Sequence, residues 1–300
     1  MFRIGTRGSP LALAQAGMVR DALVARGHMA NAISINVIRT SGDVIQDRPL
    51  ADAGGKGLFT KEIEDALLRN DIDLAVHSAK DVPTFLPHGL MLAACLPRED
   101  ARDAFVSRKA KSIAELPQGA TVGTSSPRRE AIVRRARPDI KVTLLRGNVE
   151  TRLRKVEEGV ADATILALAG LKRLGLADRA TAILSIEEFL PAAGQGAVAI
   201  EVRENDERIR AALATIDHAD TSVALAAERA FLAVLDGTCK TPIAAHASIF
   251  GPSISFRGLI ARPDGSTAHD IAGTGKRADA VKIGTEAGRE LKARAGAGFF

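Results

Sequence analysis

Two kinds of hydrophobic periodicity alternate along this chain, and that alternation limits its possible folds more than any other feature. Residues 33–37 place an apolar side chain at every second position, as a half-buried strand does. Within residues 59–67 apolar side chains recur every four positions, which is typical of an amphipathic helix. Because the two patterns continue to take turns as far as about residue 202, the sequence predicts an α/β fold.

The same reasoning locates further elements and two linkers. Strands are expected at 72–76, 90–96, 142–144, 163–168 and 197–202, and helices at 127–136 and before Gly159. The charged, proline-containing stretch 97–102 and the segment 190–196 are expected to be linkers between parts of the fold.

The last third of the chain has a different organisation. It combines a helix at 222–235, a loop at 236–239, two successive strands at 242–250 and 253–260, and a terminal helix at about 278–294. Adjacent strands followed by a helix indicate a separate α+β domain. A length of 300 residues agrees with more than one domain.

Positive charge is concentrated in the middle of the chain. The net charge is only +5, but ten of the 41 Lys and Arg residues crowd into residues 128–155. Such a field favours an anionic partner, either a nucleic acid or a polycarboxylate. Since the chain has no Trp and no Tyr, base stacking would depend on Phe alone, which disfavours a nucleic acid.

Neither a membrane helix nor an export signal is expected. No run of 18 uncharged apolar residues occurs, and Gly8-Ser9-Pro10 interrupts the basic and apolar pattern at the N-terminus. These features predict a cytoplasmic protein that does not enter a membrane. The two cysteines, Cys95 and Cys239, show no metal-ligand spacing, so no metal site is expected.

The segment 124–129, Thr-Ser-Ser-Pro-Arg-Arg, suggests an anion site at a helix start. Ser126 is a suitable N-cap and Pro127 a suitable first helical residue. Free backbone N–H groups would then face outward beside Arg128 and Arg129, although the helix dipole disfavours cations there. An ordinary cap with solvated arginines is the competing interpretation.

Other basic residues accompany Gly, Ser or Asn near expected strand ends. Arg7, Lys56, Arg146 and Arg152 have this placement, and ligands of α/β sheets bind at the carboxyl ends of strands. Together they predict a cleft that holds several carboxylates, although each alone is commonly a surface charge.

Two residues are candidates for chemistry. Asp81 follows the strand that leads into Ser78 and Lys80, where it could stabilise a developing cation or move a proton, or merely cap a helix. Cys239 lies in a glycine-containing loop beside Lys240, which favours a thiolate. From the residues alone, an inert thiol and a nucleophile are equally acceptable for Cys239.

Eight segments, read in order, resemble those of the porphobilinogen deaminase family. They are Thr6–Leu13, Gly54–Phe59, His77–Pro83, Gly123–Arg129, Leu145–Arg152, Ala169–Gly175, Pro191–Ala197 and Asp236–Pro242. The resemblance covers nearly the whole chain and is weakest after about residue 245. Asp236-Gly237-Thr238 departs from the Gly-Gly or Gly-Ser run that is common before the family's cysteine.

The resemblance implies a three-part architecture. Two lobes similar to those of periplasmic binding proteins, with the chain crossing between them twice, would be followed by a smaller α+β C-terminal domain. The implied boundaries are 1–96 with 197–214 for the first lobe, 102–190 for the second, and 219–300 for the domain that attaches the cofactor.

The resemblance also implies a function in porphyrin and heme biosynthesis. The family's transferase activity deaminates four porphobilinogen molecules and joins them into hydroxymethylbilane, with release of ammonia. The chain grows on a dipyrromethane cofactor, here held by a thioether to Cys239, and Asp81 is the implied catalytic carboxylate. The residues implied to bind cofactor or substrate are Arg7, Ser9, Lys56, Ser78, Lys80, Thr124, Ser126, Arg128, Arg129, Arg146, Arg152, Arg173 and Gln195.

Expected partners follow from the same resemblance. The substrate is porphobilinogen, the product passes to uroporphyrinogen-III synthase, the protein is a monomer, and neither nucleic acid nor membrane is bound. The main rival is an anion-binding protein without catalysis, which would need no cysteine adduct.

Overall fold

The computed structural model describes residues 1–44, 57–235, 241–296 and 298–299, and these form two compact units. The first unit combines Met1–Glu99 with Gly196–Val223. The second combines Asp100–Gln195 with Ala224–Phe300. The chain therefore leaves the first unit and returns to it.

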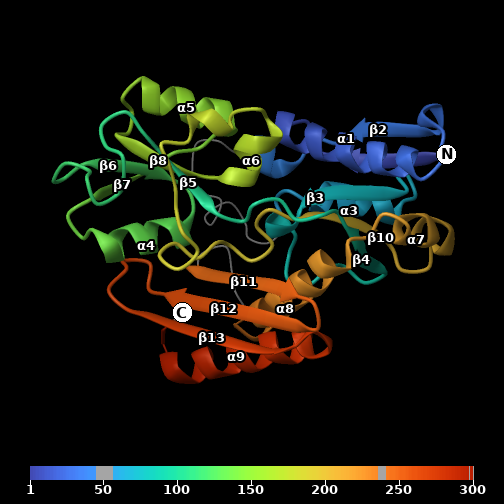
Figure 1. The fold of residues 1–300 in the computed structure, drawn as a ribbon. Coiled ribbons are helices and arrows are strands. Elements are labelled where there is room, and N and C mark those ends of the chain that lie inside the picture. The colour runs from blue at the N-terminus through green and yellow to red at the C-terminus, as the bar shows by residue number, and fades with distance from the viewer. Residues whose placement is uncertain (45–56, 236–240, 297, 300) are drawn as a thin grey trace. The chain divides into compact units, whose positions relative to one another are not determined.

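A five-stranded sheet forms the centre of the first unit (Figure 1). Its strands are β1 (Phe2–Thr6), β2 (Ile33–Val37), β3 (Leu74–Ser78), β4 (Leu90–Cys95) and β10 (Val198–Arg203), in the order β2-β1-β3-β10-β4. Strands β1, β2 and β3 are parallel, whereas β10 is antiparallel to both of its neighbours. The returning segment thus supplies a strand inside the sheet.

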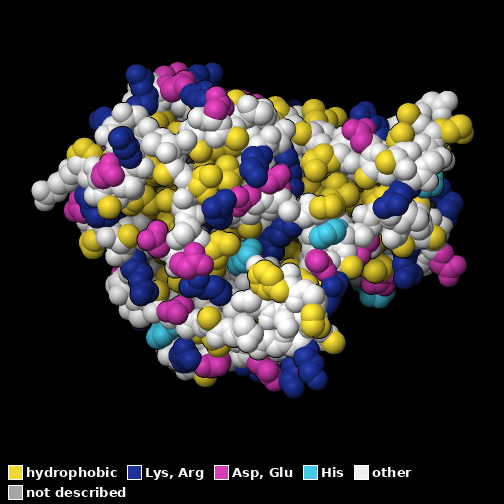
Figure 2. Space-filling model, in the orientation of Figure 1, with side chains coloured by type: hydrophobic (Ala, Val, Ile, Leu, Met, Phe, Trp, Pro, Cys, Tyr) yellow, Lys and Arg dark blue, Asp and Glu magenta, His cyan; other side chains and the backbone are white. Residues whose placement is uncertain are grey.

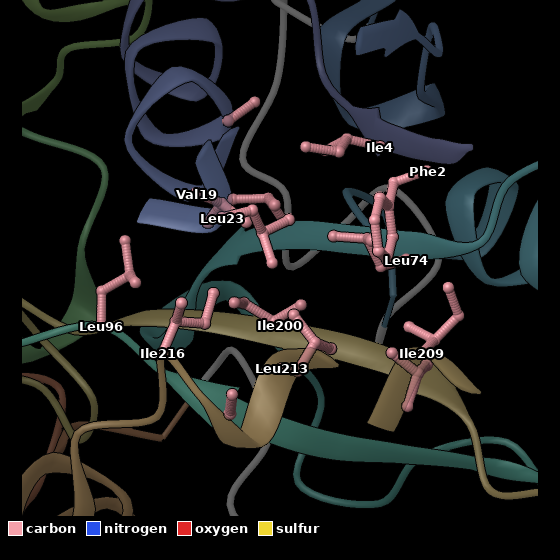
Figure 3. Close-up of a cluster of buried hydrophobic side chains, with 14 of the residues drawn as sticks. Phe2, Ile4, Val19, Leu23, Leu74, Leu96, Ile200, Ile209, Leu213 and Ile216 are labelled. Atoms are coloured by element: carbon pink, nitrogen blue, oxygen red, sulfur yellow. The ribbon is translucent and has the colours of Figure 1, made fainter. Parts of the chain in front are cut away.

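Helices cover both faces of this sheet. The helices α1 (Pro10–Ala25) and α7 (Glu207–Ala214) place apolar side chains in one core with the sheet, and α3 (Lys61–Leu68) contributes to another. Figure 3 shows Val19 and Leu23 of α1 directed toward Leu74 and Ile200 of the sheet. A short helix, α2 (Ser41–Val44), follows β2.

The second unit contains a sheet with the same strand arrangement. Its strands are β5 (Asp103–Ser107), β6 (Thr121–Thr124), β7 (Lys141–Leu144), β8 (Ala163–Ala167) and β9 (Ala182–Ile183), in the order β7-β6-β8-β5-β9. Strand β6 is parallel to β7 and β8, and β5 is antiparallel to β8 and β9. In both sheets, the strand that follows a linker is the antiparallel one.

The helices of this sheet also lie in two layers. The helix α4 (Pro127–Ala136) packs into one core, and α5 (Val149–Glu157) and α6 (Leu168–Arg173) pack into another. Pro127 occupies the first turn of α4, where its missing N–H costs nothing.

The C-terminal part is an antiparallel sheet covered by helices. It consists of α8 (Ala219–Leu235), β11 (Ile243–Phe250), β12 (Ser253–Ala261), β13 (Ala268–Lys276) and α9 (Ala280–Ala295). The strands lie in the order β11-β12-β13, and α9 packs against β12 and β13 (Figure 1). Phe231 of α8 meets Phe256 of β12 edge to face, with ring centroids 5.3 Å apart.

The predicted class, α/β with two lobes and a smaller α+β C-terminal part, is confirmed. The structure adds several elements that the patterns did not predict, among them α1, β5, α7 and β13. Helix α1 buries Ala12, Gln15 and Ala16 beside Val19 and Leu23, so its buried face gives a weak apolar signal. The predicted three-domain division and its boundaries stay a prediction.

None of the helices within the described residues is long and apolar enough to cross a membrane.

Close contact between α8 and α9 yields the first testable prediction. A Cβ atom at Gly284 would lie 2.0 Å from the carbonyl oxygen of Ala227, whereas a Cβ at Gly273 would meet nothing within 4 Å. Gly284→Ala should therefore lower the free energy of unfolding by about 1–3 kcal/mol, although alanine is the better helix former. Gly273→Ala is the control and should change the free energy of unfolding little. Denaturant unfolding measures both variants. Equal stability of the two variants would contradict the close packing.

Candidate functional site

In the first unit, polar residues gather where the parallel strands β1 and β3 end. Arg7 and Ser9 follow β1, and Ser78 closes β3 just before Asp81. These four residues line one cavity, together with side chains of α1 and residues that precede α3. The parallel pairing of β1 with β3 brings them together, because it places the carboxyl ends of both strands at one edge.

The two serines of this cavity have defined partners. Ser9 is the N-cap of α1, and its hydroxyl accepts a hydrogen bond from the N–H of Ala12. Ser78 exchanges hydrogen bonds with the buried amide of Gln15, at 2.9 and 3.1 Å between heavy atoms. Gln15 was not predicted. The buried face of helix α1 is marked by few large apolar side chains, so the sequence pattern gave no signal that Gln15 is buried.

Arg7 is held by an acidic and an aromatic partner. Its guanidinium forms an ion pair with Asp43 and lies over the ring of Phe59, 4.0 Å from the centroid. Burial raises the pKa of Asp43, but hydrogen bonds from Arg7 and Thr40 outweigh it, so the pKa is lowered overall. Arg7 is thus oriented toward the cavity by neighbours within the same unit.

A single 3₁₀ turn, Ala79–Asp81, presents Asp81 and Lys80. Its first residue is buried, and the N–H of Ala79 donates to the carbonyl of Ala197 just before β10, at 3.0 Å. Asp81 and Lys80 are exposed. The turn is therefore anchored on the sheet while both charged side chains remain accessible.

In the second unit, the segment 124–129 has the predicted local structure. Ser126 caps α4, accepting a hydrogen bond from the N–H of Arg129, and the hydroxyl of Thr124 accepts from the N–H of Ser126. The neighbouring loop after β7 lies close by, since the N–H of Leu145 donates to the carbonyl of Thr124. Two successive strand ends thus meet at one edge of the sheet.

The guanidinium groups of Arg128 and Arg129 do not project outward as the anion-site interpretation expected. Both side chains are about 5–6% exposed. Each donates a hydrogen bond of 2.7 Å to Asp103, Arg128 to one carboxylate oxygen and Arg129 to the other. Gln195 donates to the same carboxylate at 3.0 Å and to the carbonyl of Ala101. Arg128 also donates to the carbonyl of Leu190.

Asp103 was missed in the sequence analysis. It follows directly after the stretch expected to be a linker, and no local pattern marks it as buried. Burial raises its pKa, but the charges of Arg128 and Arg129 and their hydrogen bonds lower it to about 2. Two cations share one anion, so this cluster keeps a net positive charge.

The remaining predicted arginines belong to other segments of the second unit. Arg146 is nearly buried after β7, and its carbonyl accepts a hydrogen bond from Lys155. Arg152 lies in α5, where its Nε donates to the carbonyl of Gly147 at 2.9 Å. Arg173 is the last residue of α6. Lys56 and Cys239 lie outside the described residues.

Comparison with known proteins identifies the family. The model described as "Porphobilinogen deaminase, dipyromethane cofactor binding domain" matches residues 2–211, and that of the porphobilinogen deaminase C-terminal domain matches residues 223–293. The chain belongs to the porphobilinogen deaminase family. The porphobilinogen deaminases of Nitrobacter hamburgensis and Nitrobacter winogradskyi are each 62% identical over 299 residues, which are 99% of this chain and 94% of theirs.

Solved structures of binding proteins show a more distant similarity. A putative methionine-binding lipoprotein of Bacillus subtilis is 16% identical over 72% of this chain and 89% of its own, with a TM-score of 0.45. A nutrient-binding protein of Burkholderia cenocepacia bound to methionine is 16% identical over 71% and 90%, with a TM-score of 0.44.

The described residues fit the dipyrromethane cofactor that the porphobilinogen deaminase family binds. This cofactor carries acetate and propionate groups, which need cationic and hydrogen-bonding donors. The edge of the second sheet supplies hydroxyls and N–H groups at the start of α4, with Arg146 and Arg152 on the adjacent loop and helix. The net positive charge around Asp103 adds to an environment that suits carboxylates.

Asp103 yields the second prediction. Asp103→Asn leaves two buried guanidinium groups without their anion, so it should lower the free energy of unfolding by about 3–5 kcal/mol at neutral pH. Because folding lowers the pKa of Asp103 from 3.8 to about 2, its stabilisation is present above pH 4 and is lost as pH falls toward 2. The variant should lack that acid-dependent loss.

Denaturant unfolding between pH 2 and pH 7 measures both effects. Asp178→Asn is the control, since Asp178 is exposed and its side chain has no ion pair among the described residues. The assignment fails if Asp103→Asn behaves like that control at neutral pH.

Proposed function

We propose that this chain deaminates four porphobilinogen molecules and joins them head to tail into hydroxymethylbilane, a reaction that releases ammonia. The observation that carries the proposal is the match of porphobilinogen deaminase family models to residues 2–211 and 223–293. The cavity that contains Arg7, Ser9, Ser78 and Asp81 supports it, because it combines anion donors with a carboxylate.

Cys239 is proposed to hold the dipyrromethane through a thioether. It is the better candidate of the two cysteines, since Cys95 is buried at the end of β4 with 3% of its surface exposed. A thiolate is the reactive form, and the adjacent Lys240 favours it. The bound cofactor supplies a nucleophilic pyrrole carbon that starts the chain.

Asp81 is proposed to act on the substrate as ammonia leaves. Loss of ammonia from the aminomethyl group leaves positive charge on the pyrrole ring, and a nearby carboxylate stabilises it. When the new carbon–carbon bond has formed, the α-carbon loses a proton, which Asp81 can accept. Its exposure on an anchored turn makes it accessible to substrate in a fixed position.

The basic and hydroxyl residues are proposed to bind the acetate and propionate groups of cofactor and substrate. Each charge-assisted hydrogen bond from an arginine to a carboxylate contributes roughly 1.5–3 kcal/mol. The proposed set is Arg7, Ser9, Lys56, Ser78, Lys80, Thr124, Ser126, Arg128, Arg129, Arg146, Arg152, Arg173 and Gln195. Within it, we infer that Arg128, Arg129 and Gln195 act mainly through the charge of the Asp103 cluster, since their side chains are buried.

The cellular setting is proposed from the family resemblance. The protein acts as a monomer in the cytoplasm and its product passes to uroporphyrinogen-III synthase. Nucleic acid is not a proposed partner: on the face drawn in Figure 2, basic side chains are interspersed with acidic ones instead of forming a continuous basic stripe. The three domains with the boundaries given above belong to the same proposal.

The third prediction concerns the adduct on Cys239. The intact mass of the purified protein should exceed the mass of its sequence by one dipyrromethane, and Cys239→Ala should remove that excess. Cys95→Ala is the matched control and should keep it. An active protein of unmodified mass would overturn the attachment.

The fourth prediction concerns Asp81. Asp81→Asn keeps the size of the side chain but removes its charge, so turnover of porphobilinogen should fall by at least about 10²-fold while the protein folds normally. Asp81→Glu keeps the charge and should retain more activity than Asp81→Asn. Steady-state rates and circular dichroism of the three proteins test this. Wild-type rates in both variants would exclude a catalytic role.

A further inference from the structure

A buried cluster of three titratable side chains lies in the first unit. His77 of β3 and Glu201 of β10 are 3.0 Å apart between Nε2 and Oε2, with side chains 3% and 0% exposed. His77 pairs with Ala199 across the two strands, so Glu201, two residues further on, points to the same face of the sheet. Helix α3 packs on these strands and contributes Glu64, which is also buried.

The cluster has more acidic groups than basic ones. His77 can supply at most one positive charge against two carboxylates, and an ionised carboxylate without a partner is costly to bury. One oxygen of Glu64 and one of Glu201 are buried without a hydrogen bond among the described residues. Burial, with the nearby charge of Glu201, raises the pKa of Glu64, while the hydroxyl of Thr60 and the charge of His77 act in the opposite direction.

Charged residues of the neighbouring elements do not neutralise this excess. The arginines of these elements are paired with other acids, among them Arg3 with Asp73, Arg7 with Asp43, and Arg203 with Asp206. On α3 itself, Asp65 adds a further negative charge near Glu64, Glu62 accepts hydrogen bonds from Ser41, and Lys61 is exposed. Within the described part of the unit, His77 is therefore the basic side chain that interacts with both glutamates.

This cluster reaches the functional cavity through His77. The same cavity is lined by His77, Ser78 and Asp81, and Glu201 contacts the lining residue His77 directly. A change in the charge of the cluster therefore changes the electrostatic potential in the cavity, because buried charges are weakly screened. Anionic ligands bind there less well when the cluster gains negative charge.

We propose that His77, held by Glu201, is a positioning residue of the substrate cavity, and that the proton on Glu64 controls the charge of this buried cluster. With that proton bound, the cavity accepts the substrate's carboxylates. When the proton is lost, the cluster gains a negative charge and repels them. This inference rests on the proposed function, in which the cavity binds porphobilinogen.

The fifth prediction compares pH profiles of the holoenzyme. In Glu64→Gln the side chain near His77 and Glu201 cannot ionise, so the fall of kcat/KM with rising pH should begin at least about one pH unit higher, mainly through KM. Glu201→Gln removes the charge that faces His77 and weakens the hydrogen bond that positions it, so it should lower kcat/KM by at least about tenfold. His88→Gln, which changes an exposed histidine of the same unit, is the control and should keep the wild-type profile.

Thermal unfolding against pH gives a second measurement that does not depend on activity. Folding raises the pKa of Glu64, so the wild type loses stability as pH rises above the ordinary value of 4.5. Glu64→Gln should lack this loss and be at least as stable as wild type at pH 8. A less stable Glu64→Gln at that pH, or an unchanged activity profile, would overturn the proposal.

The two proposals fail in different ways. A wild-type protein that does not convert porphobilinogen overturns the proposed function, and the unfolding measurement still tests the proton on Glu64. An active wild type whose profile coincides with that of Glu64→Gln overturns only the role of the cluster.

Discussion

The carboxylate of Asp103 is the interaction on which the second unit most depends. It lies at the start of the antiparallel strand β5 and accepts hydrogen bonds from Arg128 and Arg129 in the first turn of α4. Gln195, at the end of the segment that leaves this unit, donates to it as well. One buried anion therefore holds together the start of strand β5, the first turn of helix α4 and the segment through which the chain leaves the unit. Burial without these partners would be too costly for any of the charges involved.

The first unit arranges its polar groups by a comparable principle. Arg7 at a strand end is oriented by Asp43, much as the two arginines of α4 are oriented by Asp103. In both units cations are paired with acids of the same unit before any ligand binds, so the arginines are already ordered. A ligand that uses them loses less side-chain entropy than one that must order free side chains. Such preorganisation suits an enzyme that must hold a lengthening polyanion.

The antiparallel strands connect the fold to the site. Strand β10 returns from a distant part of the sequence and anchors the turn of Asp81, since the carbonyl of Ala197 accepts a hydrogen bond from the N–H of Ala79. The same strand carries Glu201, which contacts His77 of the cavity lining. The second crossing of the chain thus supplies both support for the candidate catalytic carboxylate and a buried acid in contact with the cavity lining.

Local patterns in the sequence determined the α/β class, most strands and helices, the cap at Ser126, and the cluster of basic residues near strand ends. These features depend on neighbours within a few residues, where periodicity and capping rules apply. The pattern also singled out Asp81, because it follows a strand together with Ser78 and Lys80. The family resemblance added roles for Asp81 and Cys239, which the residues alone left open.

Only the tertiary structure decided which acids accompany the basic residues. Asp103 is 25 and 26 residues from Arg128 and Arg129, and His77 is 124 residues from Glu201. No local signal distinguishes a buried acid from a solvated one, because burial is set by strands and helices that pack from elsewhere in the chain. For the same reason helix α1, whose buried face includes alanine and Gln15, became visible only through its packing on the sheet. The sequence therefore predicted where the positive charges lie, and the fold determined how they are neutralised.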